Sequence, residues 1–123
     1  MRDFRKFVVT DLSRALAVKV YGILESFPRD ERYDFCRQLR RAVVSVGANI
    51  AEGAGRHTDK DFAHFLSQSI GSACEVEYLL LLATDLGFIE EKQRAQIDDD
   101  IQHVKSKLYR FRESLGAENP PHR

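Results

Sequence analysis

The sequence predicts an all-α protein that folds as an antiparallel up-down-up-down four-helix bundle, and three observations lead to this prediction. Apolar residues recur every three or four positions through long blocks of the chain, as they do along the buried face of an α-helix. Three prolines and seven glycines occur, and several of them stand between these blocks. No block shows the strict alternation of apolar and polar residues that is typical of strands.

The first helix is predicted over residues 11–26 and follows an N-terminal apolar arm over residues 1–9. Thr10 or Asp11 can cap the helix, because a short polar side chain at this position accepts a hydrogen bond from a backbone N–H of the first turn. The arm is expected to use four large apolar side chains for packing. These are Phe4, Phe7, Val8 and Val9.

The second helix is predicted over residues 28–54. Pro28 suits the first position of a helix, where its fixed φ is already helical and its missing N–H leaves no hydrogen bond unmade. Gly53 and Gly55 stand where this helix should end, and we expect them to supply the left-handed conformation that closes it. Phe27 and Pro28 then form the hinge between the first two helices.

The third helix is predicted over residues 59–86 and the fourth over residues 90–115. Thr58 and Asp61 form a variant capping box at the start of the third helix, with Asp in place of the usual Glu or Gln. Short loops between helices of this length imply antiparallel neighbours. The fourth helix has the clearest apolar seam, which consists of Ile97, Ile101, Val104, Leu108, Phe111 and Leu115.

These elements indicate one domain, because 123 residues suffice for one hydrophobic core and are too few for two. The bundle is expected to span residues 10–116. A flexible C-terminal tail follows over residues 117–123, which include two consecutive prolines. Hydrophobic residues make up 43% of the chain and charged residues 31%, a composition typical of soluble folded proteins rather than disordered ones.

Charge and cysteine content limit the classes of partner. Nineteen basic and nineteen acidic side chains give zero formal net charge, so the chain lacks an overall basic excess for gripping phosphate backbones. Cys36 and Cys74 make no disulfide framework and are expected to be buried, inert thiols. The longest apolar run, Tyr78 to Ala83, is too short to cross a bilayer, and no signal-peptide-like leader opens the chain. We therefore expect a cytoplasmic protein with no membrane partner.

Three stretches are more apolar than the helices of an isolated bundle need to be. Residues 42–51 contain no charge, and residues 76–83 and 15–24 contain one each. Helices that are apolar on several faces must be covered on several faces, and burying a leucine-sized side chain stabilises by roughly 1.5–3 kcal/mol. We therefore expect a homo-oligomer with Val44 and Ala48 at the contact face. The alternative is a scatter of isolated apolar surface residues, which are common on monomers.

The second and third predicted helices each carry a stripe of polar side chains at helical spacing. If these helices fold back about a loop centred near Arg56, Arg37 faces Glu75. In the same register, Arg41 faces Gly71 and Ser72. We interpret the stripes as a structural network that fixes the helix register, with a ligand or catalytic pocket as the alternative. The network consists of Arg37, Arg41, Ser45, Asn49, Glu52, Ser72 and Glu75.

Residues suited to catalysis or metal binding form no recognised motif. The chain contains no glycine-rich phosphate loop, no G-x-S-x-G elbow and no H-E-x-x-H sequence. His57, Asp61 and His64 have the spacing of metal ligands on one helix face, but without an evident fourth ligand we interpret them as solvated. We therefore predict no enzyme, no metal and no cofactor. An enzyme would require a solvent-accessible cleft lined by Arg41, Asn49, Glu52 and Glu75.

Positive charge is concentrated in the first half of the chain. Residues 1–60 hold 12 basic and 8 acidic side chains, whereas residues 61–123 hold 7 and 11, so the halves carry +4 and −4. An oligomer would repeat the basic segment around a ring and raise the local field. Binding of RNA or a ribonucleoprotein is therefore the alternative function, and its candidate residues are Arg29, Arg32, Arg37 and Arg40.

The block QLRRAVVSVGANIAEGAGR at 38–56, followed by DFAHFLSQSIGSACEVEYLL at 61–80, resembles a bacterial family known as the four-helix bundle proteins. Some members are encoded in intervening sequences inside large-subunit ribosomal RNA genes. The resemblance runs over residues 7–88 and includes the N-I-A-E-G and G-S-x-x-E signatures. The family's signature positions correspond here to Arg40, Arg41, Ser45, Asn49, Ile50, Glu52, Gly53, Gly71, Ser72 and Glu75.

The resemblance implies an antiparallel bundle that assembles as a pentamer and has no enzymatic activity. The family is also similar to the accessory variability determinant of diversity-generating retroelements, a pentamer that engages a reverse transcriptase and RNA. Two features of this chain differ from the pattern. Val46 and Gly47 stand where the family usually has a proline after Ser-Ile, and the neutral net charge contrasts with the basic retroelement proteins.

Overall fold

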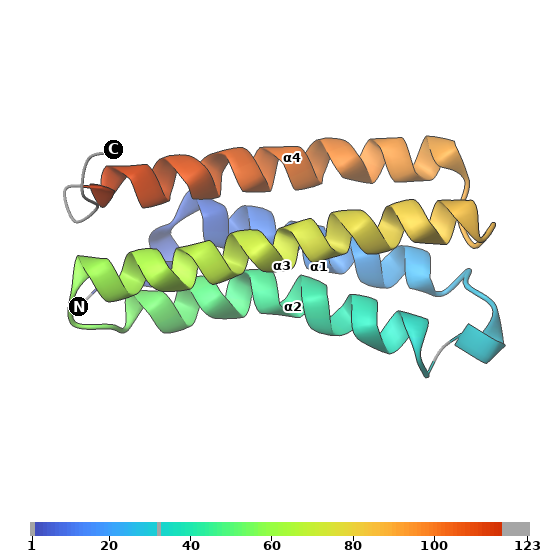
Figure 1. Cartoon of the computed structure of the whole chain (residues 1–123), viewed down its shortest axis with the longest axis horizontal. Coiled ribbons are helices and arrows are strands. Elements are labelled where there is room, and N and C mark those ends of the chain that lie inside the picture. The colour runs from blue at the N-terminus through green and yellow to red at the C-terminus, as the bar shows by residue number, and fades with distance from the viewer. Residues whose placement is uncertain (1, 32, 117–123) are drawn as a thin grey trace, which may run out of the picture.

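The computed structural model describes residues 2–31 and 33–116, which form four antiparallel helices (Figure 1). Helix α1 (Val8–Leu24) packs against α2 (Phe35–Ala54) and α4 (Glu91–Ser114), and α3 (Asp59–Asp85) also packs against α2 and α4. Helices α1 and α3 are therefore diagonal to each other. Two 3-10 turns, η1 (Phe4–Lys6) and η2 (Arg29–Glu31), precede α1 and α2. The predicted all-α four-helix bundle is confirmed.

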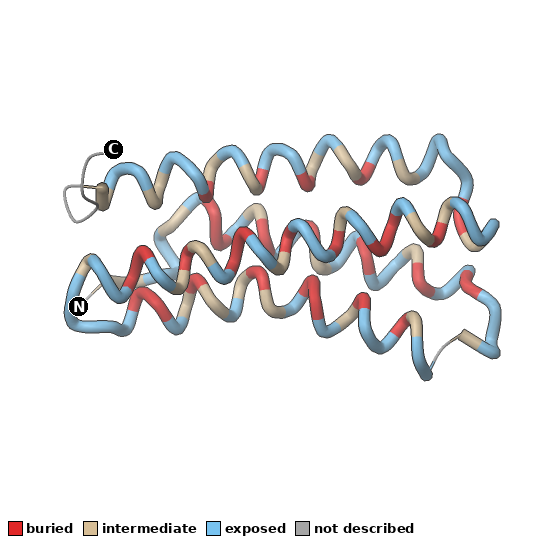
Figure 2. The backbone as a smooth tube through the Cα atoms, viewed as in Figure 1, coloured by how far each residue is buried: buried red, intermediate tan, exposed pale blue. Residues whose placement is uncertain are grey.

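Each helix turns one apolar stripe towards the centre of the bundle, where the stripes form one continuous core (Figure 2). The predicted seam of the fourth helix lies in this core: Ile97, Ile101, Val104 and Leu108 are buried, and Phe111 and Leu115 pack against them. The start of α4 is also as predicted, because Glu90 and Gln93 form a reciprocal capping box there. Burial of these stripes supplies the main stabilisation of the fold.

The N-terminal helix begins earlier than predicted. It starts at Val8, so the expected cap at Thr10 or Asp11 is wrong, and the end of the predicted apolar arm belongs to α1. Thr10 is buried within the first turn of the helix. The reason is tertiary packing: the ring of Phe7, at the N-cap position, lies 4.9 Å from the ring of Phe111 and 6.0 Å from that of Phe62.

The second helix begins later than predicted, at Phe35 rather than Pro28. Residues 29–31 form η2 instead, and the expected hinge at Phe27 and Pro28 is the start of a longer connection. An aromatic cluster anchors this connection, because the rings of Phe27, Phe35 and Phe88 lie with centroids 5.5, 5.6 and 6.0 Å apart. The packing of these rings at the end of the bundle has a larger effect on where the helix begins than the preference of Pro28 for the first position of a helix.

The glycines at the end of α2 do not adopt the predicted left-handed conformation. Gly55 has φ −82°, and Gly87, which follows α3 with φ 78°, is the residue with positive φ in the described part of the chain. Gly53 instead provides space: a Cβ added there would lie 2.6 Å from the Cβ of Phe65 and 2.9 Å from Cδ1 of Phe62. The absence of a side chain at Gly53 lets α2 and α3 approach each other closely before the turn.

Gly53→Ala is therefore expected to lower the free energy of unfolding by about 1–3 kcal/mol, even though alanine favours a helix over glycine. The added methyl group must displace α2 from α3, since the Cβ of Phe65 is not the end of a flexible side chain. Denaturant unfolding followed by circular dichroism measures the change. Gly22→Ala is the matched control, because nothing lies within 4 Å of a Cβ there. Equal stabilisation by both substitutions would contradict the packing role of Gly53.

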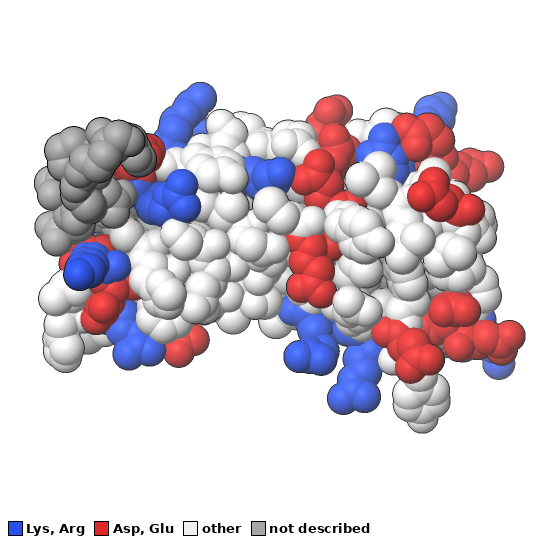
Figure 3. Space-filling model, in the orientation of Figure 1, with Lys and Arg blue, Asp and Glu red and all other residues white. Residues whose placement is uncertain are grey.

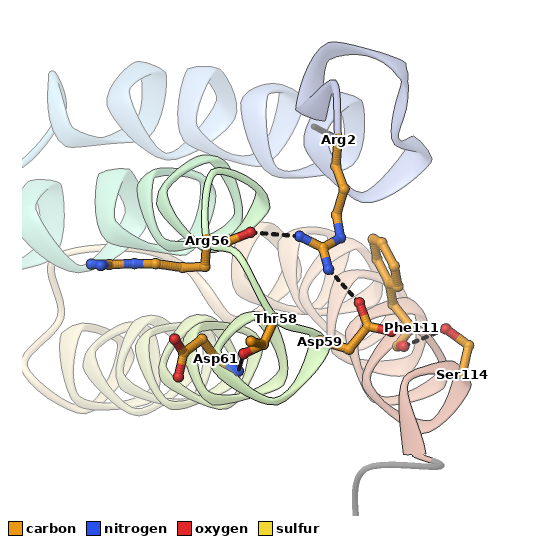
Figure 4. Close-up of polar contacts among 7 residues, drawn as sticks. All are labelled: Arg2, Arg56, Thr58, Asp59, Asp61, Phe111 and Ser114. Atoms are coloured by element: carbon orange, nitrogen blue, oxygen red, sulfur yellow. Dashed lines mark hydrogen bonds and ion pairs between the residues drawn. The ribbon is translucent and has the colours of Figure 1, made fainter.

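Polar contacts fasten the N-terminal segment to the turn between α2 and α3 (Figure 4). The Arg2 guanidinium donates to the carbonyl oxygen of Arg56 over 2.9 Å, forms an ion pair with Asp59 and lies 4.8 Å from the ring centroid of Phe62. The predicted Thr58 cap is confirmed, because its hydroxyl accepts a hydrogen bond from the Asp61 N–H over 3.1 Å. The predicted tail over residues 117–123 lies outside the described residues.

Candidate functional site

The polar stripes of α2 and α3 meet at a small hydroxyl and amide cluster. The Ser72 hydroxyl donates to Oγ of Ser45 over 3.0 Å, and the Asn49 amide donates to the same Oγ over 3.0 Å and to the Ser45 carbonyl over 2.9 Å. All three residues are half-buried. The helices therefore pair Ser45 with Ser72, about one turn away from the predicted pairing of Arg41 with Ser72.

The charged members of the predicted network lie elsewhere. Glu75 is exposed and accepts a hydrogen bond of 3.3 Å from Gln38, so the predicted pairing with Arg37 is wrong. Arg37 and Arg41 are exposed, and neither bonds to another described residue. Helix α2 ends at Ala54 and α3 begins at Asp59, so the turn is centred beside Arg56, close to the predicted position. The partners nevertheless differ from the prediction, because Glu75 meets Gln38 rather than Arg37 and Ser72 meets Ser45 rather than Arg41.

The polar residues considered for a catalytic pocket do not converge on one point. Glu52 is exposed and forms an ion pair of 3.4 Å with Arg56, which lies in the turn after α2. Asn49 is bonded within the serine cluster, and Glu75 contacts Gln38. None of the four candidates, Arg41, Asn49, Glu52 and Glu75, bonds to another of the four. Among the described residues, this arrangement lacks a base and an acid held around a common reacting atom.

Glu75→Ala is expected to change the free energy of unfolding by less than about 1 kcal/mol, because exposed polar contacts of this kind contribute little. A buried pair with Arg37 would have made the same substitution cost about 3–5 kcal/mol. Urea unfolding of the wild type and the variant distinguishes the two values. A loss in the larger range would show that Glu75 has a buried cationic partner.

Two further close contacts lie inside the bundle. The buried Ser69 hydroxyl donates to the Val46 carbonyl over 2.6 Å, which ties α3 to α2 beside the serine cluster. A Cβ at Gly47 would lie 2.9 Å from Oγ of Ser13, so Gly47 allows α1 to approach α2. Ser69 stands at an apolar position of its helix, and a hydroxyl at such a position is the sequence signal that indicates a buried partner.

The basic residues considered for nucleic-acid binding lie along and before the first half of α2. Arg29, in η2, and Arg37 are exposed, whereas Arg40 is half-buried. Arg32 lies outside the described residues. Arg41, one turn beyond Arg37, extends the exposed basic row along the helix. Arg37 and Arg41 therefore present two exposed guanidinium groups on one face of α2.

The two cysteines differ in environment. Cys36 is buried, as predicted, but Cys74 is exposed on α3, so the expectation that both thiols are buried is wrong. The side chains of the described residues bring together no three His, Cys, Asp or Glu residues able to hold a metal ion. His64, one of the considered ligands, instead contacts Gln68 over 3.0 Å.

An ion pair links α3 to α4. Nζ of Lys105 lies 2.8 Å from Oε1 of Glu77, and the Gln102 amide donates to the other carboxyl oxygen over 3.0 Å. Hydrogen bonding to Lys105 lowers the pKa of Glu77, and hydrogen bonding to Glu77 raises the pKa of Lys105. The pair therefore stabilises the fold between the two titrations. This contribution falls as pH drops through the lowered carboxyl pKa, and it also falls as pH rises through the raised ammonium pKa.

Glu77→Gln is expected to lower the free energy of unfolding by about 1 kcal/mol at about pH 7 and by clearly less at about pH 3, because the contribution of a carboxyl with a lowered pKa declines as pH falls below its ordinary value. Glutamine keeps the size of the side chain and can still accept from Gln102. Urea unfolding at the two pH values gives the comparison. A loss of equal size at both would show that packing, rather than charge, is responsible.

An apolar groove, called here the α1/α2 groove, runs between the first two helices and has a volume of about 340 Å³. Most of the residues that line it are small or apolar. Val44 is 49% exposed. The residues that follow it on α2 are uncharged as far as Ala51. The groove is lined by Phe4, Thr10, Ser13, Arg14, Ala17, Val43, Val44, Gly47 and Ala48.

A second apolar surface, called here the α3 face, consists of Gly71, Cys74, Tyr78 and Leu81, which are all exposed. Tyr78 is 61% exposed and Leu81 45% exposed. Figure 3 shows a broad uncharged area over the first half of α3, an acidic side chain near its middle, and further acidic side chains gathered over the end of the bundle where α3 ends and α4 begins. Such contiguous apolar surface is uncommon on proteins that remain monomeric.

Fold and site together define a class of protein: an all-α antiparallel bundle with an internal serine cluster and uncovered apolar surfaces. The profile of the 23S rRNA-intervening sequence protein family matches residues 5–110. The chain belongs to this family. No helix in the described ranges is long and apolar enough to span a membrane.

A solved structure is similar over most of both chains. It is the 1.70 Å crystal structure of a protein of unknown function from the S23 ribosomal protein family of Bacteroides thetaiotaomicron VPI-5482. The two chains are 28% identical and superpose with a TM-score of 0.77, covering 86% of this chain and 99% of the other. A search of curated proteins finds no match.

Proposed function

We propose that this protein is a non-enzymatic subunit of a homo-oligomeric ring that serves as an assembly or interaction module. The observation that carries the proposal is the uncovered apolar surface of the bundle, present both in the α1/α2 groove and on the α3 face. A ring of five subunits is proposed from the family resemblance alone. The proposed location is the cytoplasm.

The energetics of burial support association. Covering one side chain such as Tyr78 or Leu81 contributes on the order of 1.5–3 kcal/mol, and several such side chains are exposed at once. Because the two surfaces lie on different sides of the bundle, one partner copy cannot cover both. Each chain therefore contacts two neighbours, which is the arrangement of a ring.

Sedimentation velocity at micromolar concentration tests the proposal. We expect a single species of several times 14.1 kDa, the mass of one chain. A stable particle of 14.1 kDa at these concentrations would overturn the proposal, and a discrete oligomer with another number of subunits would overturn only the number five.

A second candidate function is binding of RNA or a ribonucleoprotein by the assembled ring. The observation that favours it is the basic row on η2 and α2, where Arg29, Arg37 and Arg41 are exposed and bond to no other described residue. A ring would repeat this row in every subunit, which strengthens attraction to a phosphate backbone.

Fluorescence anisotropy with labelled single-stranded RNA over a series of salt concentrations tests this candidate. We expect affinity that falls steeply with salt and is lost in the double variant Arg37→Glu, Arg41→Glu. Arg110→Glu, an exposed charge reversal on α4, is the control and should have a smaller effect. Absence of binding at low salt would eliminate the candidate.

A further inference from the structure

The α1/α2 groove and the α3 face lie on opposite sides of the bundle, because α1 and α3 are diagonal and α3 packs against α2 and α4 (Figure 1). We propose that the groove of one copy receives the α3 face of a second copy, so that every chain contributes both surfaces. The inference rests on the homo-oligomer proposed above and identifies the contact that builds it. A contact between two different surfaces continues from copy to copy and can close into a ring.

Charge favours the α3 face of the second copy, rather than its groove, as the surface that occupies the groove of the first copy. Residues 1–60 carry a formal charge of +4 and include both helices that form the groove. Residues 61–123 carry −4 and include the whole α3 face. Arg14 lines the groove, and the exposed Glu75 and Asp85 lie on α3 within two turns of Tyr78. Packing groove against groove would place two basic halves together, while packing groove against α3 brings opposite charges together.

Gly71 is unexplained by the single chain. It lies inside α3, where glycine is less favourable than alanine, and nothing in the chain comes within 4 Å of a Cβ placed there. Gly53 and Gly47, by comparison, each make room for a close neighbour within the chain. Gly22, inside α1, has equally open surroundings, so an open glycine does not by itself mark a contact. Gly71 is assigned to the contact because it lies on the α3 face, where a helix of another copy can approach its backbone.

The internal register identifies the residues that meet. The hydrogen bond between Ser45 and Ser72 places these residues at the same height along the bundle. Because α2 and α3 are antiparallel, Val44 in the groove and Cys74 on the α3 face also lie at nearly one height, on opposite sides. Copies related by rotation about an axis along the bundle keep this height. With the ring axis proposed to run along the bundle, Val44 of one chain meets α3 of the next chain near Gly71 and Cys74.

Cross-linking through the natural thiol tests this contact. In the Val44→Cys variant, each chain carries one reactive thiol in the groove and one at Cys74, while Cys36 is fully buried. A short bis-maleimide is expected to join these thiols between chains and to give a ladder of linked species on a denaturing gel. The ladder should disappear when Cys74→Ser is added, and the wild type should give none. Ala48→Cys, one turn along the groove, provides an independent second position.

Each outcome has a defined meaning when the mass of the same samples is measured by sedimentation. A ladder that depends on Cys74 supports the contact. Linked dimers that persist with Cys74→Ser show that two grooves face each other and overturn it. Oligomers from which neither Val44→Cys nor Ala48→Cys gives a ladder overturn this contact but leave the oligomer intact. A wild type that is monomeric overturns the proposed function itself, and this inference with it.

A bulk substitution provides a second measurement. Gly71→Leu is expected to raise the concentration at which the assembly dissociates by about tenfold or more, because a side chain then occupies the space of the neighbouring copy. Gly22→Leu is the matched control, since Gly22 is exposed on α1, has open space around it and does not line the groove. Equal effects of the two substitutions would show that the neighbour does not contact Gly71.

Discussion

Val44→Glu is expected to separate the assembly into folded single chains of 14.1 kDa. Val44 is 49% exposed in the single chain, so a glutamate there remains solvated and the helix tolerates it. In the assembly the same carboxylate would be buried against an apolar and acidic neighbour, which costs far more than the lost contact alone. We expect association to weaken by about 100-fold or more, equivalent to about 3 kcal/mol.

Sedimentation equilibrium measures the dissociation, and circular dichroism verifies that the helices remain. Val18→Glu is the control, because Val18 is 73% exposed on α1 but does not line the groove. If the Val44→Glu protein keeps the mass of the wild type, the groove is not a contact surface. If both variants dissociate, exposed charge on any part of the first two helices is sufficient and the groove has no special role.

Phe62→Ala is expected to have the largest effect on stability, a loss of about 3–5 kcal/mol in the free energy of unfolding. Phe62 is fully buried, and its ring lies 5.2 Å from that of Phe111 and 6.0 Å from that of Phe7. It therefore joins the N-terminal segment, α3 and α4, and the Arg2 guanidinium lies over it. Truncation leaves a cavity at the point where these three parts meet. The melting temperature should fall by roughly 10–20 °C.

Differential scanning calorimetry checks this value, with two comparison variants. Phe62→Leu keeps most of the volume and should lose clearly less, which keeps the measurement informative if Phe62→Ala does not fold. Tyr33→Ala removes an aromatic ring that is 84% exposed and should leave stability within about 0.5 kcal/mol of the wild type. Similar losses for Phe62→Ala and Tyr33→Ala would mean that burial in the aromatic cluster does not determine stability.

Much of the helical architecture is predictable because it depends on local periodicity. The seam from Ile97 to Leu108 fixes which side of α4 is buried, and the Thr58 and Glu90 caps fix where α3 and α4 begin. The start of α1 and that of α2 are not predictable in this way. The first residues of these two helices are set by aromatic rings that come together from distant segments, such as Phe7 with Phe111 and Phe27 with Phe88.

The candidate site shows the same division. A polar seam between α2 and α3 is visible in the sequence as two stripes at helical spacing. Which members of the stripes touch depends on how α2 and α3 pack against each other, and the partner of Ser72 is Ser45, one helical turn from the predicted Arg41. The role of Gly53 likewise changes from a helix terminator to a packing space. Sequence spacing does not measure the distance between helices.

The sequence by itself determined the number of helices, their antiparallel order, the apolar stripe of each and the family, because these depend on residue type and spacing along the chain. Tertiary structure alone decided the register of α2 against α3, the exposure of Cys74 and the placement of uncovered apolar residues on two opposite sides of the bundle. The physical reason is that periodicity specifies which face of a helix is apolar. How much of that face is covered depends on how closely and at what height the neighbouring helices pack.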